Sequence, residues 1–142
     1  MRLSVLDQST TASGRSPDES IRESLALARH CEPLGYHRYW LAENHASASQ
    51  AGTAPEILMA AIATTQRIRV GSAGVMLLYY APLNVAGVFR VLEAIALGQI
   101  AMGFGRAPGL GRADRPGTEP ERGHRSRPVP CHGARRAGLD PR

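Results

Sequence analysis

Hydrophobic positions along the first 105 residues follow two alternating patterns. Four short apolar runs have the length of buried strands, at residues 3–6, 38–42, 68–75 and 99–105. Three longer segments with apolar residues at helical spacing separate these runs, at residues 17–32, 54–66 and 82–97. The order β-α-β-α-β-α-β with short connections predicts an α/β fold built on a parallel sheet. A doubly wound open sheet and a (β/α)8 barrel both begin in this way, and the pattern does not separate them.

Start signals define the predicted helices. Ser16 and Glu19, with a proline between them at the first helical position, form the signature of a capping box. Thr53 and Glu56 repeat that spacing and predict the same kind of cap for the second helix. The third predicted helix, at residues 82–97, is apolar on nearly every side, which predicts that both of its faces are buried.

The second predicted strand is followed by three polar residues, Glu43, Asn44 and His45. Each of them can ionise or form hydrogen bonds. Side chains just past the carboxyl end of a parallel strand are where barrels and open α/β sheets place their chemistry. By itself, a loop histidine such as His45 is more often a surface residue than a catalyst, but this edge is the candidate functional site.

The composition changes after residue 111. Residues 1–111 carry nine Arg and eight acidic residues, whereas residues 112–142 carry eight Arg and four acidic residues, so most of the net charge of +5 lies in the tail. The tail holds five Pro and four Gly but only two large aliphatic residues, so we expect it to be disordered. A GC-rich gene read in a shifted frame would also encode such a tail. We therefore hypothesise that residues 112–142 are a frameshifted segment.

Composition and spacing disfavour several classes of protein. No aromatic residue is interleaved with the tail arginines, so nucleic-acid binding ranks last among the classes considered. Cys31 and Cys131 are too few for a disulfide framework, and His124, Cys131 and His132 lack the spacing of a metal site, so we expect no metal. Because the sequence shows neither a signal peptide nor a long apolar run, we expect a cytoplasmic protein without a membrane span.

Four motifs lie on the predicted strands and on the turns and helix starts that follow them. They are residues 34–45 (LGYHRYWLAENH), 54–56 (APE), 67–77 (RIRVGSAGVML) and 103–109 (GFGRAPG). Together they resemble the bacterial luciferase-like flavin-dependent monooxygenases over residues 1–111. The resemblance implies the N-terminal half of a TIM-type (β/α)8 barrel, which binds reduced flavin and oxygen at the C-terminal ends of its strands.

The resemblance also implies roles for particular residues. The family has a Glu-His-His run where this chain has Glu43, Asn44 and His45. Asn44 therefore replaces the histidine that assists flavin-oxygen chemistry. Because asparagine cannot transfer a proton near neutral pH, His45 is the candidate for this acid/base role. Glu43 is grouped with the cofactor-binding residues. Ala73-Gly74 corresponds to a non-proline cis peptide under the flavin ring, and Arg106 to a contact with the flavin phosphate.

The resemblance implies an FMN-dependent monooxygenase that oxidises a small organic substrate with O2, and a deazaflavin is the alternative cofactor. A barrel of this type takes about 250 residues, so we expect this chain to be a truncated and inactive copy. Members of the family dimerise through their second and third helices. The alternative function is therefore a non-catalytic fragment that docks on a full-length relative through residues 54–66 and 82–97.

Overall fold

Four parallel strands form one sheet, in the order in which they occur in the chain. They are β1 (Ser4–Asp7), β2 (Arg38–Leu41), β3 (Arg69–Met76) and β4 (Ile100–Gly105). One helix joins each strand to the next: α1 (Pro17–Cys31), α2 (Pro55–Thr65) and α3 (Pro82–Ile95). The structure, a computed structural model, describes residues 1–45, 47 and 49–106.

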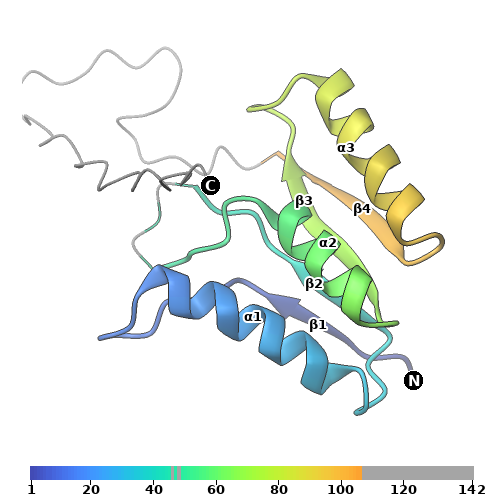
Figure 1. Ribbon diagram of the computed structural model, residues 1–142. Coiled ribbons are helices and arrows are strands. Elements are labelled where there is room, and N and C mark those ends of the chain that lie inside the picture. Colours follow the sequence, from blue (N-terminus) through green and yellow to red (C-terminus); the bar gives the residue numbers. More distant parts are fainter. Residues whose placement is uncertain (46, 48, 107–142) are drawn as a thin grey trace, which may run out of the picture.

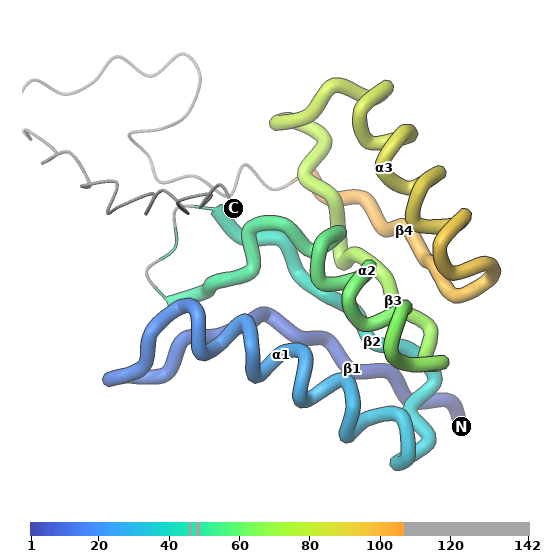
Figure 2. Tube along the Cα trace, in the orientation of Figure 1, coloured from blue at the N-terminus to red at the C-terminus, as the bar shows by residue number. Residues whose placement is uncertain are grey.

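The three helices lie on one face of the sheet (Figure 1). The path of the chain moves across the sheet from β1 at one edge to β4 at the other (Figure 2). A doubly wound sheet reverses its strand order and carries helices on both faces, whereas a barrel keeps its order and is covered only on the outside. The described residues therefore form the N-terminal half of a TIM-type barrel, and the expectation from the sequence is confirmed.

The hydrophobic core lies between the sheet and the helices. Tyr39, Leu41 and Val70 of the two central strands are fully buried in it. Phe89 and Leu92 of α3 pack into the same cluster. These residues alternate with others along each strand, because successive side chains of a strand point to opposite faces.

The opposite face of the sheet carries a row of paired residues. Leu6 pairs with Trp40, Trp40 with Gly71, and Gly71 with Ala101. A Cβ atom at Gly71 would lie 2.4 Å from the Trp40 ring, so the glycine makes room for the indole. This is the face that points into a barrel.

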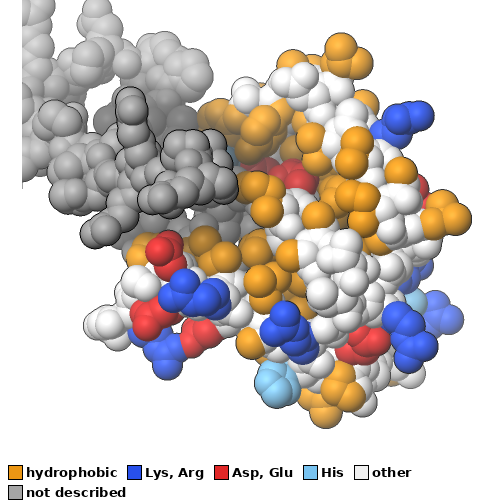
Figure 3. All heavy atoms as spheres, in the orientation of Figure 1, with side chains coloured by type: hydrophobic (Ala, Val, Ile, Leu, Met, Phe, Trp, Pro, Cys, Tyr) orange, Lys and Arg blue, Asp and Glu red, His pale blue; other side chains and the backbone are white. Residues whose placement is uncertain are grey.

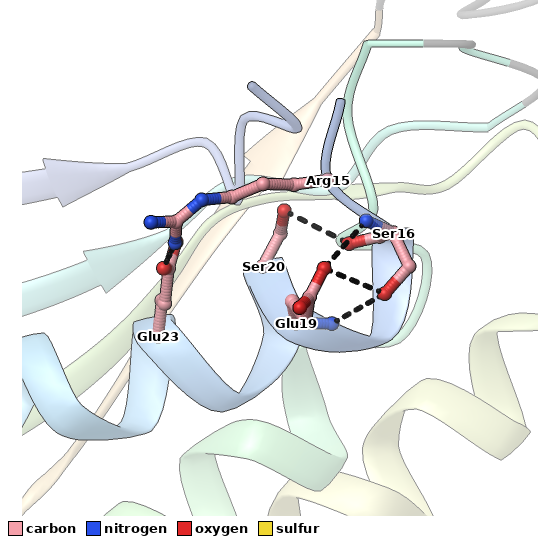
Figure 4. A network of polar contacts seen from close by, with 5 residues as sticks. All are labelled: Arg15, Ser16, Glu19, Ser20 and Glu23. Atoms are coloured by element: carbon pink, nitrogen blue, oxygen red, sulfur yellow. Dashed lines mark hydrogen bonds and ion pairs between the residues drawn. The ribbon is translucent and has the colours of Figure 1, made fainter. Parts of the chain in front are cut away.

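The N-terminal cap of α1 is the one that the sequence predicts. The Glu19 backbone N–H donates to Ser16 Oγ at 3.3 Å, and the Ser16 backbone N–H donates to Glu19 Oε2 at 2.8 Å (Figure 4). The capping box predicted for the second helix is wrong. Because α2 starts one residue later than that spacing requires, Ala54 occupies the cap position, and its side chain has no acceptor.

The prediction that α3 is buried on both faces is also wrong. Its residues Val85, Phe89 and Leu92 are buried toward the sheet. Its other large apolar side chains are exposed: Leu83, Val88, Val91 and Ile95. The reason is that no described element covers the outer side of the helix, and hydrophobic side chains gather over α2 and α3 in Figure 3.

Several sequence predictions fall on residues that the structure does not describe. The boundary at residue 111, the tail 112–142 and the residues His124, Cys131 and His132 lie outside the described ranges.

Cys31 is buried in the core, and this burial raises the pKa of its thiol. None of the described helices combines the length and apolarity needed to cross a bilayer. The described residues also contain no group of three or more His, Cys, Asp or Glu that could hold a metal ion.

Candidate functional site

The sheet brings all the predicted site residues to the carboxyl ends of its strands. Leu41, the last residue of β2, pairs with Ser72 of β3, so Ala73-Gly74 lies just beyond the level at which β2 ends. Residues 43–45 follow that end of β2, and Arg106 follows the end of β4. Because the strands are parallel, these ends share one side of the sheet.

Glu43 is the centre of a buried polar cluster. It is only 3% exposed. Its Oε2 accepts a hydrogen bond from the backbone N–H of Met76 at 2.9 Å. Its Oε1 accepts one from the Tyr80 hydroxyl at 2.6 Å and lies 2.5 Å from His45 Nε2. Both carboxylate oxygens are thus engaged by protein groups, as a buried charge requires.

Two tyrosines that the sequence reasoning did not single out complete the cluster. Burial and the hydrogen bond to Glu43 raise the pKa of Tyr80, so its hydroxyl stays protonated and acts as a donor. The ring of Tyr79 packs edge-on against His45, with 5.5 Å between the ring centroids. The signal for both was a pair of consecutive tyrosines between the third predicted strand and the proline that opens the next helix.

Asn44 is held by its backbone, and its side chain is left without a partner. Its backbone N–H donates to the carbonyl of Gly52 at 2.7 Å. Its side-chain Nδ2 is buried and makes no hydrogen bond to any described residue. A buried amide donor without a partner is costly, and it can be satisfied by an acceptor atom of a ligand.

Ala73 and Gly74 line a shallow hollow at the sheet surface. The hollow is walled by Leu6, Trp40, Ser72, Ala73, Gly74, Gly103, Phe104 and Gly105. The peptide bond between Ala73 and Gly74 is cis, as the resemblance implies. Here the pairing of β3 with β4 is irregular, between Ser72 and Val75, and Ser72 Oγ donates to the carbonyl of Gly103 at 3.1 Å. Backbone, glycine and aromatic rings make up most of this wall, which suits a flat, largely apolar ring.

Arg106 places a positive charge at the carboxyl end of β4. It is exposed, directly follows β4, and has no carboxylate partner among the described residues. A guanidinium group in this situation can bind a phosphate through two parallel hydrogen bonds.

Comparison with known proteins identifies the family. A family model described as luciferase-like monooxygenase matches residues 1–127. The chain belongs to this family. Among its relatives from Bacillus subtilis (strain 168), the uncharacterized protein YwcH is 49% identical over 108 residues, which is 75% of this chain. The N-acetyl-S-alkylcysteine monooxygenase of the same organism is 44% identical over 110 residues, which is 77% of this chain. The chain spans about a third of the length of these curated relatives, 32% and 33%.

Two solved structures share the fold of the described residues. The crystal structure of apo-MsnO8 is 48% identical and superposes with a TM-score of 0.73, covering 75% of this chain and 32% of that one. The oxygenating constituent of 3,6-diketocamphane monooxygenase from Pseudomonas putida, solved in complex with FMN, has a TM-score of 0.71. It is 20% identical and covers 75% of this chain and 30% of that one, so it shows the fold alone.

Proposed function

We propose that this luciferase-like chain forms one half of a flavin-dependent active site, in which reduced FMN and O2 oxidise a small organic substrate. The observation that carries the proposal is that the Glu43–His45 cluster, the Ala73-Gly74 hollow and Arg106 all lie at the carboxyl ends of the strands of one parallel sheet. The Pseudomonas putida relative, which has the same fold, binds FMN and supports this choice of cofactor. A deazaflavin is the alternative.

The described residues fit such a cofactor. The backbone-walled hollow at Ala73-Gly74 accepts a planar ring. Arg106 would hold the phosphate. When bound, the reduced flavin supplies the electrons that activate oxygen. In this arrangement His45 is the residue that takes up or returns a proton, since asparagine cannot do so near neutral pH.

The half barrel also limits what this chain does by itself. Among the described strands, β1 and β4 each leave one edge unpaired, whereas a closed barrel of this class has eight strands and no edges. We therefore expect the 142-residue chain to bind flavin without oxidising a substrate. Turnover requires the remaining strands of such a barrel, which are not among the described residues.

A second candidate is a non-catalytic fragment that docks on a full-length relative or on a second copy of itself. The observation that favours it is an apolar groove between α2 and α3. Its largest exposed side chains are Ile57, Leu83, Val88, Val91 and Ile95. A patch of this kind is typical of protein interfaces.

Titration with FMN separates the two functions. We expect the 142-residue chain to perturb the flavin absorption and fluorescence spectra on binding. Arg106→Ala should weaken FMN binding about tenfold, because a hydrogen bond to a charged group is lost. The same substitution should leave the binding of riboflavin, which has no phosphate, unchanged. Arg90→Ala, which removes an exposed arginine from α3, is the matched control.

The outcomes of this titration are distinct. An equal loss for FMN and riboflavin would remove Arg106 from the phosphate site. The absence of any spectral change with FMN or a deazaflavin would contradict the flavin site altogether. If sedimentation then showed a defined dimer without flavin, the interaction function would be the better description.

A further inference from the structure

The Glu43 carboxylate has the wrong surroundings for a cofactor contact. It is almost completely buried, its two oxygens already receive donors from Met76 and Tyr80, and His45 Nε2 lies 2.5 Å from Oε1. A carboxylate needs no further donor in this state, and a negatively charged cofactor group would be repelled by it. The contacts of Glu43 point inward, to the histidine two residues away.

We propose that Glu43 is a positioning residue that fixes the neutral His45 ring in the tautomer with its proton on Nε2, so that Nδ1 is the nitrogen that accepts a proton in the reaction. Which nitrogen of a histidine is protonated is set by the hydrogen bond that the other nitrogen makes. The inference rests on the proposed function and deepens it, because it assigns the atom through which the same site acts.

The donors around Glu43 decide the tautomer. Met76 contributes a backbone N–H and Tyr80 a hydroxyl that stays protonated, and both donate to the carboxylate. His45 Nε2 lies 2.5 Å from the same Oε1, an acceptor-only atom, so this nitrogen must carry hydrogen. No described residue forms a hydrogen bond with Nδ1, which leaves its lone pair available. When Nδ1 takes up a proton, the carboxylate stabilises the imidazolium that forms.

Glu43→Gln tests the proposal directly, because the neighbouring groups should allow only one orientation of the new side-chain amide. The Met76 backbone N–H can only donate, so it should hold the glutamine carbonyl oxygen in the place of Oε2. The glutamine NH2 group then faces His45 in the place of Oε1. A donor at that point requires Nε2 to become an acceptor, and the proton should move to Nδ1.

The experiment uses the full 142-residue chain labelled with 15N-histidine, without flavin. Long-range 1H–15N spectra at a pH where the imidazole is neutral report which ring nitrogen carries hydrogen, and His45→Gln assigns the signal by its loss. We expect Nε2–H in the wild type and Nδ1–H in Glu43→Gln. Tyr80→Phe removes one donor to Glu43 but not the acceptor, and Tyr79→Phe alters a ring that only packs on His45, so both should keep Nε2–H.

Each result decides the inference. A wild-type ring with hydrogen on Nδ1 overturns it, and so does an unchanged tautomer in a folded Glu43→Gln protein. If Glu43→Gln does not fold, the wild-type and Tyr80→Phe tautomers still decide, since loss of Nε2–H in Tyr80→Phe would assign the tautomer to the tyrosine instead. Because the spectra need no cofactor, a failure of flavin binding stays distinguishable from a failure of this inference.

Discussion

The centre of the sheet and its β4 edge differ in how fully the described residues surround them. At the centre, Tyr39, Leu41 and Val70 have no exposed surface, and the Glu43 carboxylate has three polar partners. The partners of Glu43 come from β3 and from the residues that follow β2 and β3, and the buried side chains pack against the helices. The centre therefore shows what the first half of a barrel can complete without help.

The β4 edge lacks that completion. Met102 is 45% exposed and Phe104 is 59% exposed, although both are large apolar residues of a strand. Arg106 follows them without a carboxylate partner among the described residues. In a closed barrel this strand has neighbours on both sides. The part of the site to which we assign proton transfer thus has its polar contacts within the described residues, whereas Arg106, which we assign to the phosphate, has no carboxylate partner among them.

The largest effect is expected from removing a core side chain at the centre. Leu41→Ala should lower the free energy of unfolding by about 2–5 kcal/mol, because it leaves a cavity in a fully buried site. Met102→Ala, a truncation of similar size at the edge, should cost less than about 1 kcal/mol. Urea unfolding of the two variants measures the difference. Equal losses would contradict this expectation, since they would mean that the β4 edge is as well covered as the centre.

A smaller effect tests how tightly β4 is held on its one paired side. A Cβ atom at Gly103 would lie 2.4 Å from the backbone carbonyl oxygen of Ser72, which has little freedom to move. Gly103→Ala should therefore lower the free energy of unfolding by about 1–3 kcal/mol. Gly87→Ala in α3 is the matched control, because its Cβ meets nothing within 4 Å and should gain up to about 1 kcal/mol.

If Gly103→Ala were as harmless as Gly87→Ala, β4 would be loosely attached. The centre and the edge would then differ in order as well as in burial. Hydrogen exchange of the β4 amides would show this directly, because a loosely held strand opens locally at low free energy.

The strands and helices could be predicted from the sequence, because the residue patterns that form them are local. Every predicted strand and helix exists, and each boundary lies within two residues of its predicted place. The two errors both concern what surrounds an element. Thr53 has the right spacing for a cap but not the position, and the apolar residues of α3 outnumber those that the sheet can cover.

The sequence singles out residues of the candidate site, but it does not predict the contacts between them. Glu43 and His45 stand out as polar groups after an apolar strand, whereas their partners are distant in the chain. Met76 lies 33 residues and Tyr80 37 residues beyond Glu43, and only the register of β2 against β3 brings them together. No periodicity carries that information. For this reason the sequence predicts Glu43 only as a cofactor contact, whereas its hydrogen bonds support our proposal that it positions His45.

The smallest effect tests how far the charge of the central cluster extends. Glu56, in the first turn of α2, is partly buried, and this burial and the nearby Glu43 raise its pKa above the ordinary value of 4.5. The folded protein therefore favours the protonated form. The corresponding stability is complete below pH 4.5 and is lost as the pH rises through the folded pKa. Glu56→Gln imitates the protonated form, so it should gain no more than about 0.5 kcal/mol at neutral pH and nothing in acid. Urea unfolding of both proteins at the two pH values measures this difference. If Glu56→Gln instead lowered the free energy of unfolding at neutral pH, the attraction of the α2 N-terminus for a negative charge would outweigh the repulsion from Glu43. The charge of the Glu43 cluster would then have no net effect on α2.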